Sequence, residues 1–349
     1  MTADVLAWIL LAAVAAYACG GGVDYGAGFW DLVAGGAERG RRPRWLIDHA
    51  MAPVWEVNNV WLIFVLVLMW TGFPVFFQTV FTAMWLPLAL AAVGLLLRGA
   101  GFALRKPARR LAARRVYGAV FAVSSVVTPF FFGAVVGGVA SGRVAPGTTA
   151  SADVWANTAS VQTGLLTVAA TAYLGAVFLT ADAGRFDAPD LVRYFRLRAW
   201  AGLAAVAVLA LIGLTVTDDH ASYVHHGLTH GIGLALLAAA AVAAAATGWL
   251  VAGRSAGWAR YSSVASVVLV VAAWGFAQRP YLVPTSLTVQ QAAGADGPLK
   301  WLLFVSAVAV VLIGPALVVL YRLDTHGVLE PLTDADVAGG RGPGEGAGP

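Results

Sequence analysis

The chain contains about nine apolar runs that are each long enough to cross the hydrocarbon core of a membrane. A helix needs about 20 mainly apolar residues to span about 30 Å of hydrocarbon. The runs cover approximately residues 5–34, 50–72, 76–98, 115–140, 158–181, 195–216, 227–252, 260–278 and 299–321. The sequence therefore predicts an all-α, polytopic membrane protein with about nine transmembrane helices.

The composition excludes several classes of protein. Hydrophobic residues make up 60% of the chain and charged residues 11%, whereas about 25% of residues in average proteins are charged. The single cysteine, Cys19, excludes an intramolecular disulfide and a metal cluster built from cysteines. The sequence has no Walker, GxGxxG or HExxH motif, which argues against nucleotide-driven pumps and membrane metalloproteases. No feature of the chain indicates nucleic-acid binding.

Basic residues gather in alternate connections between the spans. They follow the first, third, fifth and seventh spans: Arg39, Arg41, Arg42 and Arg44; Arg105, Lys106, Arg109, Arg110, Arg114 and Arg115; Arg185, Arg193, Arg196 and Arg198; Arg254 and Arg260. Connections rich in arginine and lysine stay in the cytoplasm. The pattern predicts an outside N-terminus and a cytoplasmic C-terminus. Glycine and proline in residues 333–349 favour a flexible cytoplasmic tail, assigned to residues 324–349.

The start of the second span carries polar side chains that hydrocarbon tolerates poorly. Glu56 is followed by Asn58 and Asn59 before the apolar run begins. An ionisable residue inside a membrane costs a few kcal/mol and usually faces protein or water, often on a proton path. Glu56 is therefore a candidate proton carrier. The alternative interpretation is a helix end that lies among the lipid headgroups.

The first span carries two further carboxylates. Asp24 and Asp31 lie seven residues apart, about two helical turns, on one face. Because the first span runs inward and the second runs back, Asp24 and Glu56 are expected on the cytoplasmic side in one polar cluster. Arg98, predicted at the inner end of the third span, lies at the same depth. A snorkelling arginine is the alternative for Arg98.

Glycines and histidines have simpler interpretations. Gly22 and Gly26 form a small-residue face suited to close helix packing. All histidines fall in loops or at helix ends, so no span carries a mid-membrane imidazole able to ligate haem iron. His226 and His230 could share a helix face and hold a metal, but an exposed helix start is the favoured interpretation because no carboxylate or cysteine accompanies them.

Five segments, in this order along the chain, resemble subunit II of the cytochrome bd family of quinol oxidases. They are DYGAGF from Asp24, APVWEVNNVW from Ala52 to Trp61, RGAGF from Arg98, ADA around Asp182, and WGFAQRPY from Trp274 to Tyr281. The segment before Trp61 is the most specific of the five. The resemblance runs from the first span to the ninth.

The resemblance implies a role in a membrane oxidase. In that family a partner, subunit I, holds b-type and d-type haems, oxidises quinol and reduces oxygen to water. This chain is then expected to be a non-haem subunit of a quinol:oxygen oxidoreductase, with no covalent cofactor and no metal, in a bacterial cytoplasmic membrane. A small accessory transmembrane subunit and a bound quinone are left open, as are the identity of the quinol and an all-b haem content.

The family also implies roles for individual residues. Glu56, Asp24 and Arg98 would belong to a proton route from the cytoplasm, and Trp61 would lie beside an oxygen passage. Trp55 and Asn59 are candidate contacts to a quinone or to the partner. The alternatives are a structural Asp24 and Arg98 pair, and core packing for Trp61.

The family fold implies two four-helix bundles, at about residues 5–140 and 158–278, and a peripheral helix at about 299–321, all within a membrane domain of residues 1–323. A short internal similarity relates Asp24 to Asp182. Two other functions stay open. A proton-coupled secondary transporter would work without a haem partner, and a purely structural subunit would need no titrating carboxylate.

Overall fold

The structure is a computed structural model that describes residues 1–36, 38–51, 55–105, 107–108, 110–253 and 255–325. The first half comprises α1 (Thr2–Leu32), α2 (Arg41–Met51), α3 (Trp55–Val67), the π-helix η1 (Leu68–Gly72), α4 (Pro74–Ala83), α5 (Trp85–Arg105), α6 (Leu111–Ala140) and α7 (Ala152–Trp155). The second half comprises α8 (Thr158–Arg185), α9 (Pro189–His220), α10 (Ser222–Thr229), α11 (Gly231–Ala252), α12 (Ala256–Ala277), β1 (Tyr281–Val283), β2 (Leu287–Thr288), α13 (Val289–Ala292) and α14 (Asp296–Thr325).

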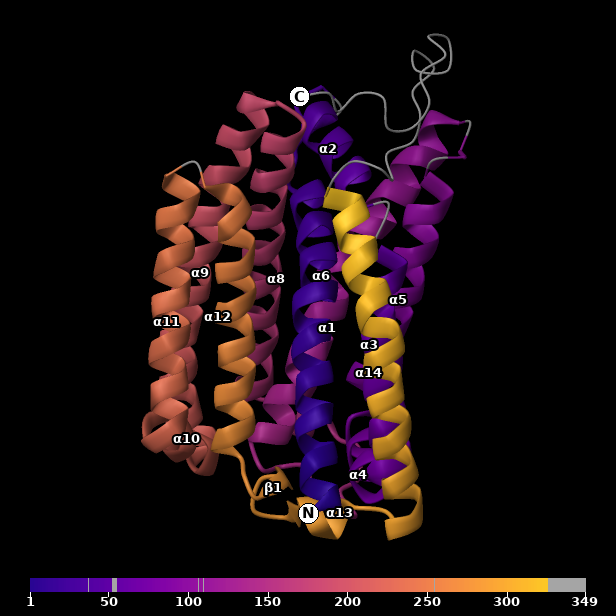
Figure 1. The fold of residues 1–349 in the computed structure, drawn as a ribbon, viewed down its shortest axis with the longest axis vertical. Helices are drawn as coiled ribbons and strands as arrows, with labels where there is room; N and C mark the ends of the chain where they lie inside the picture. Colours follow the sequence, from indigo (N-terminus) through magenta and orange to yellow (C-terminus); the bar gives the residue numbers. More distant parts are fainter. Residues whose placement is uncertain (37, 52–54, 106, 109, 254, 326–349) are drawn as a thin grey trace.

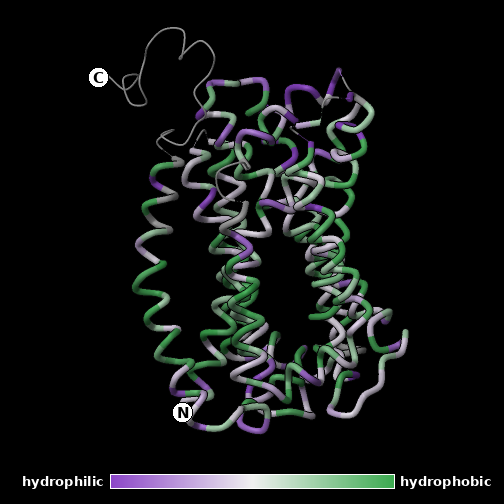
Figure 2. Tube along the Cα trace, turned by 90° about the vertical axis from the view of Figure 1, so that its right-hand side faces the viewer, coloured by the Kyte–Doolittle hydropathy of each residue, from purple (hydrophilic) through white to green (hydrophobic). Residues whose placement is uncertain are grey.

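The long helices lie side by side along the longest axis of the molecule. Figure 1 shows α8, α9, α11 and α12 on one side of α1, and α3, α5 and α14 on the other. Hydrophobic residues dominate the middle of these helices and hydrophilic residues gather toward the two ends (Figure 2). Within the described residues, 8 helices are long and apolar enough to cross a membrane, or up to 9 crossings with one bent pair. The predicted all-α, polytopic class is confirmed, while the division into two four-helix bundles stays a prediction.

The third predicted span, at residues 76–98, is wrong in its bounds. Pro74 starts the short helix α4, which is bent by 114° from the preceding crossing, and the membrane-length helix is α5 (Trp85–Arg105). Phe73 leaves the helical region, with φ −134° and ψ 63°, because a residue before proline is disfavoured in helical geometry. Proline then fits the first turn of the next helix. Apolar composition alone does not reveal such a bend.

Helices α1 and α8 touch through their backbones. A Cβ atom added to Gly26 would lie 1.9 Å from the carbonyl oxygen of Thr171, and one added to Gly175 would lie 2.5 Å from the carbonyl carbon of Gly26. Such distances leave room only for glycine. The indole nitrogen of Trp30 donates to the carbonyl of Ala172 at 2.8 Å and fastens the same pair of helices. The predicted packing role of Gly26 is confirmed.

The connection between α12 and α14 is an ordered cap on the bundle. β1 and β2 pair antiparallel, and Thr288 and Gln291 form a capping box that starts α13. The amide of Gly294 donates to the carbonyl of Gly72 at 2.9 Å, which ties this cap to the bend after η1. The predicted boundary at residue 323 falls inside α14, and the remainder of the predicted tail, residues 326–349, lies outside the described residues.

We expect Gly175→Leu to lower the free energy of unfolding by about 1–3 kcal/mol or more, because the new side chain has no space against α1. Gly184→Leu is the matched control, since it lies in the same helix and a Cβ there meets nothing within 4 Å. Thermal unfolding in detergent measures both. Equal stability of the two variants would contradict the backbone contact between α1 and α8.

Candidate functional site

A buried polar cluster lies where α1, α3 and α5 meet. Asp24 on α1 and Asn58 on α3 are 3% and 4% exposed. The side-chain amide of Asn58 donates to Oδ2 of Asp24 at 2.9 Å. Arg98 on α5 is also 3% exposed, and its charge acts on the Asp24 carboxylate. The structure thus brings together two of the three predicted proton-route residues, Asp24 and Arg98. The side chain of the third, Glu56, lies outside the described residues, and it precedes Asn58 by two positions on α3.

Arg98 is held by aromatic rings in the protein interior. Its Cζ atom lies 4.9 Å from the ring centroid of Tyr25 and 5.5 Å from that of Phe121, distances at which cation–π attraction is effective. Its Nε and Nη2 atoms have no hydrogen-bond partner within the described residues. Arg98 lies seven residues before the last residue of α5, so the snorkelling alternative and the predicted helix-end position are both wrong. The misplaced third span caused that error.

The direct partner of Asp24 is an amide. The structural alternative from the sequence paired Asp24 with Arg98, but within the described contacts Asp24 accepts its hydrogen bond from Asn58. Arg98 lies against the ring of Tyr25, the residue that follows Asp24 on α1. An amide donor fixes the position of a carboxylate without neutralising it. Asp24 therefore keeps a titratable carboxyl group inside the bundle.

A pair of tyrosines adjoins the cluster and was missed by the sequence analysis. The hydroxyl groups of Tyr17 and Tyr25, both on α1, lie 2.7 Å apart. Tyr25 is 3% exposed, and the ring of Tyr17 meets Phe132 of α6 edge-on at 6.0 Å between centroids. The available signal was two phenol groups within an apolar span, because a buried tyrosine hydroxyl usually finds a partner. The spacing of eight residues does not indicate that the two hydroxyls meet.

Asp31 has a different role from Asp24. Its carboxylate accepts from Nε of Arg44 at 2.6 Å and from Nη1 of Arg105 at 2.5 Å, and Arg105 also reaches Asp48 at 3.5 Å. These ion pairs tie the ends of α1, α2 and α5 together. The side chain of Asp31 is 4% exposed, so its two positive partners are needed for its charge to be tolerated. Asp31 is a structural anchor.

Asp24 and Asp182, which the sequence analysis related to each other, have different partners, and the internal repeat stays a prediction. Asp182 lies three residues before the end of α8 and accepts from Nη2 of Arg260 at 2.5 Å. Asp31 lies one residue before the end of α1 and is likewise paired with arginine. Asp24 lies eight residues before that end and has an amide partner. By depth and by bonding, the counterpart of Asp182 is Asp31.

The remaining predicted residues lie on α3. Trp61 and Asn59 are partly buried, and the side chain of Trp55 lies outside the described residues. Trp61 follows Asn58 by three positions, so the two side chains share one face of α3 about one turn apart. Trp61 therefore continues the face that carries the Asn58 contact to Asp24, farther from the start of the helix.

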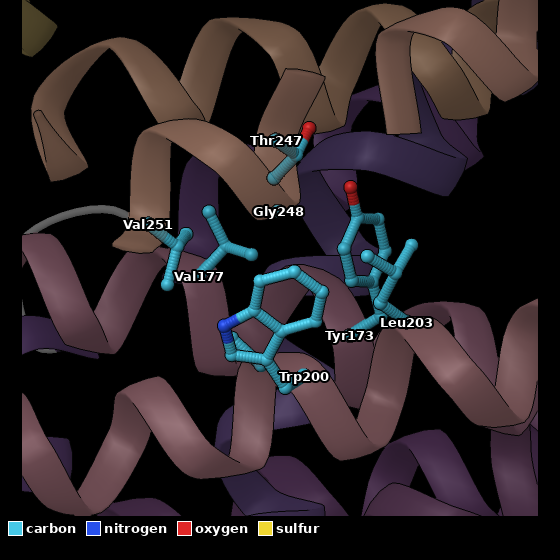
Figure 3. A pocket seen from close by; sticks show the side chains of 8 residues that line it. Tyr173, Val177, Trp200, Leu203, Thr247, Gly248 and Val251 are labelled. Carbon is cyan, nitrogen blue, oxygen red and sulfur yellow. The ribbon is translucent and has the colours of Figure 1, made fainter. Parts of the chain in front are cut away.

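The described residues outside the Asp24 cluster include a narrow crevice and no metal-binding group. Among the described residues, no group of three or more His, Cys, Asp or Glu is placed to hold a metal ion. Figure 3 shows a crevice between α8, α9 and α11 that includes Tyr173, Trp200 and Thr247. It is too narrow to admit a water molecule. These side chains therefore form a packing contact between helices.

Comparison with known proteins supports one family. The family model described as cytochrome bd terminal oxidase subunit II matches residues 2–324. A curated relative, cytochrome bd ubiquinol oxidase subunit 2 of Bacillus subtilis (strain 168), is 27% identical over 112 residues. That match covers 32% of this chain and 32% of the relative, so it spans about a third of the relative's length.

A solved structure agrees over nearly the whole fold. A chain of the bd oxidase from Geobacillus thermodenitrificans superposes with a TM-score of 0.76 at 26% sequence identity. The superposition covers 93% of this chain and 98% of that chain. With the family model matching almost the full length, the chain belongs to the cytochrome bd terminal oxidase subunit II family.

Proposed function

We propose that the chain is the non-haem subunit of a quinol:oxygen oxidoreductase. A haem-bearing subunit I would oxidise quinol and reduce oxygen to water, with its b-type and d-type haems supplying the electron transfer. The family match over residues 2–324 and the likeness to a bd oxidase structure support this assignment. The complex would lie in a bacterial cytoplasmic membrane, with the arginine-rich ends of the helices inside and the N-terminus outside.

The proposed contribution of this chain is a proton route. Oxygen reduction consumes protons, and protons cross a low-dielectric region only along titratable groups and water. The observation that carries the proposal is Asp24, a carboxylate inside the bundle whose one described hydrogen bond comes from the Asn58 amide. Glu56 would take up protons at the start of α3, and Asp24 would receive them. Arg98 would line the route beside Asp24, against the ring of Tyr25.

The hydroxyl groups of Tyr17 and Tyr25, 2.7 Å apart, would extend the proposed route along α1 toward the middle of the membrane. Hydroxyl groups both donate and accept hydrogen bonds, so such a pair can pass a proton without carrying a lasting charge. The track would thus run from the end of α1 that carries Asp31 into the interior. Asp31 forms ion pairs with Arg44 and Arg105, so the proposed route does not include it.

Trp61 would lie beside an oxygen passage. It is partly exposed, one turn from Asn58 and at the start of the apolar part of α3, and oxygen prefers an apolar path. Trp55 and Asn59 are proposed contacts to the partner or to a quinone. A small accessory transmembrane subunit would complete the assembly, surrounded by lipid.

The first prediction on function concerns Glu56. Purified through a tag on this chain, the wild-type complex should carry haem and oxidise quinol. Glu56→Gln should keep the haem absorption spectrum and slow quinol-driven oxygen uptake by about tenfold or more, because a general acid or base contributes at least that much. Glu56→Asp should be milder because the carboxylate is retained.

Glu38→Gln is the matched control for this measurement, since Glu38 is exposed in the loop before α2. It should leave oxygen uptake unchanged. Wild-type turnover in Glu56→Gln would remove Glu56 from the route. A tagged chain that purifies alone and colourless would contradict the oxidase assignment and favour a transporter.

Substitutions of Asp24 and Asp31 distinguish the proposed proton carrier, Asp24, from the acid that forms structural ion pairs, Asp31. Asp24→Asn keeps an acceptor for the Asn58 amide but removes the titrating group, and it should slow oxygen uptake. Asp31→Asn should lower the free energy of unfolding by about 1–3 kcal/mol, because two partly exposed arginines, Arg44 and Arg105, lose hydrogen bonds to a charged acceptor. Unfolding in detergent and oxygen uptake are measured on both. Normal turnover in Asp24→Asn would indicate a purely structural subunit.

Trp61→Ala should raise the oxygen concentration needed for half-maximal rate and leave the maximal rate of oxygen uptake near that of the wild type. Removal of the ring changes the shape of the apolar path without touching a titratable group. Trp249→Ala, at a 74% exposed tryptophan of α11, serves as the control. Unchanged oxygen dependence in Trp61→Ala would leave Trp61 as a packing residue.

A further inference from the structure

A second site lies at the opposite end of the bundle from the arginine-rich connections. There α10 joins α11, and a cavity of about 350 Å³ opens. Tyr223 and His226 of α10, His230 before α11, and Arg279 after α12 contribute its polar lining. None of these residues belongs to the Asp24 cluster or to the ion pairs of Asp31. The proposed oxidase function gives this cavity no role.

The two histidines are held as a pair. Their rings stack with centroids 4.3 Å apart and 26° between planes. Nδ1 of His230 lies 3.0 Å from the carbonyl oxygen of His226, a contact that fixes the ring and leaves Nε2 as its other polar atom. Both side chains are exposed. Each imidazole can present an N–H group to an anion in the cavity.

Arg279 is positioned beside them. Its guanidinium lies over the ring of Trp8, at 5.0 Å from the centroid, and 3.8 Å from Asp4. The hydroxyl of Tyr223 donates to the backbone carbonyl of Arg279 at 2.6 Å. Burial and the neighbouring phenol of Tyr281 raise the pKa of Tyr223, so this donor stays protonated. Arg279 is still 48% exposed and therefore accessible to a ligand.

The charge around the cavity favours an anion over a metal ion. The residues lining it include an arginine and two histidines and no carboxylate or cysteine. Gly231, Ile232 and Gly233 in the first turn of α11 also line it, and no side chain caps that helix start. Uncapped amides and the helix dipole add positive potential. A divalent cation held by the two histidines would lie beside the Arg279 guanidinium, whose carboxylate neighbour, Asp4, is 3.8 Å from it and outside the cavity lining.

The depth of the cavity matches that of lipid phosphates. α11 contains 22 residues and is therefore about 33 Å long, which places its first residue at the edge of the hydrocarbon core. Trp8, Tyr223 and Tyr281 gather at this level, as aromatic residues do at membrane boundaries. Phe276 and Ile232 supply apolar surface in the same cavity. A ligand with a phosphate next to acyl chains fits this combination.

We propose that this cavity binds the phosphate group of a phospholipid headgroup, through Arg279, His226, His230 and the first amides of α11. A free phosphate ion offers the same phosphate oxygens as the lipid headgroup but has no acyl chains. The apolar wall and the depth of the cavity favour the lipid. The proposal does not depend on the oxidase function, since lipid binding is measured without turnover.

The test uses the purified complex in detergent after removal of bound lipid. Short-chain phosphatidylglycerol and inorganic phosphate are titrated separately, and the midpoint of thermal unfolding is recorded because a ligand of the folded state raises it. We expect the lipid to stabilise the wild type at lower concentration than phosphate does. The double variant with Arg279→Gln and His226→Gln should need at least tenfold more lipid for the same stabilisation.

The matched control combines Arg143→Gln and His49→Gln, which remove the same side-chain types at exposed positions away from the cavity. It should titrate like the wild type. His226→Gln alone keeps the test valid if the change at Arg279 disturbs folding, because His226 is exposed, and it should weaken lipid binding at least threefold. Equal lipid dependence in the cavity variants and the control would overturn the proposal.

Two further arms separate the alternatives. Stabilisation by inorganic phosphate but not by the lipid would overturn the assignment to a lipid and indicate a free-anion site. Zinc ion is titrated as well. Stabilisation by zinc that disappears in His226→Gln but persists in Arg279→Gln would identify a metal site in place of the phosphate site. Zinc without effect, together with the expected lipid result, supports the proposal.

Discussion

Charge inside a low-dielectric bundle is the constraint on which this structure depends, because each buried ionisable group needs a compensating neighbour. Asp31 and Asp182 are paired with arginines near the ends of α1 and α8. Asp24, deeper in α1, accepts a hydrogen bond from the neutral amide of Asn58. That difference in partner sets Asp24 apart from the acids that hold helices together by ion pairs.

Close backbone packing makes the deep position possible. At Gly26 and Gly175, α1 and α8 approach until no side chain fits between them, so α1 is covered by neighbours along much of its length. This burial places Asp24 and Tyr25 inside protein instead of lipid. Arg98 then enters from α5 and lies against the Tyr25 ring. A central helix with small residues on one face and polar residues on another thereby creates an internal site in a mostly apolar molecule.

The sequence predicted the fold class well and the site only in part. Apolar run length predicted the helices that cross the membrane, since that property depends on composition alone. It misplaced the third span because Pro74 redirects the chain inside a continuous apolar run, and the depth of Arg98 was wrong for the same reason. The meeting of Asp24 and Arg98 followed from alternating helix directions. The hydroxyl contact of Tyr17 with Tyr25 and the arginine partners of Asp31 depend on helix rotation and packing, which no spacing in one chain specifies.

The bend after η1 has a consequence for biosynthesis. The carbonyl of Gly72 receives its hydrogen bond from the amide of Gly294, and that residue leaves the ribosome only after every helix except α14 has been made. The second crossing therefore enters the bilayer early but reaches its final geometry late. During translation, the bend after η1 therefore lacks its hydrogen bond from Gly294 until the chain has been made as far as that residue.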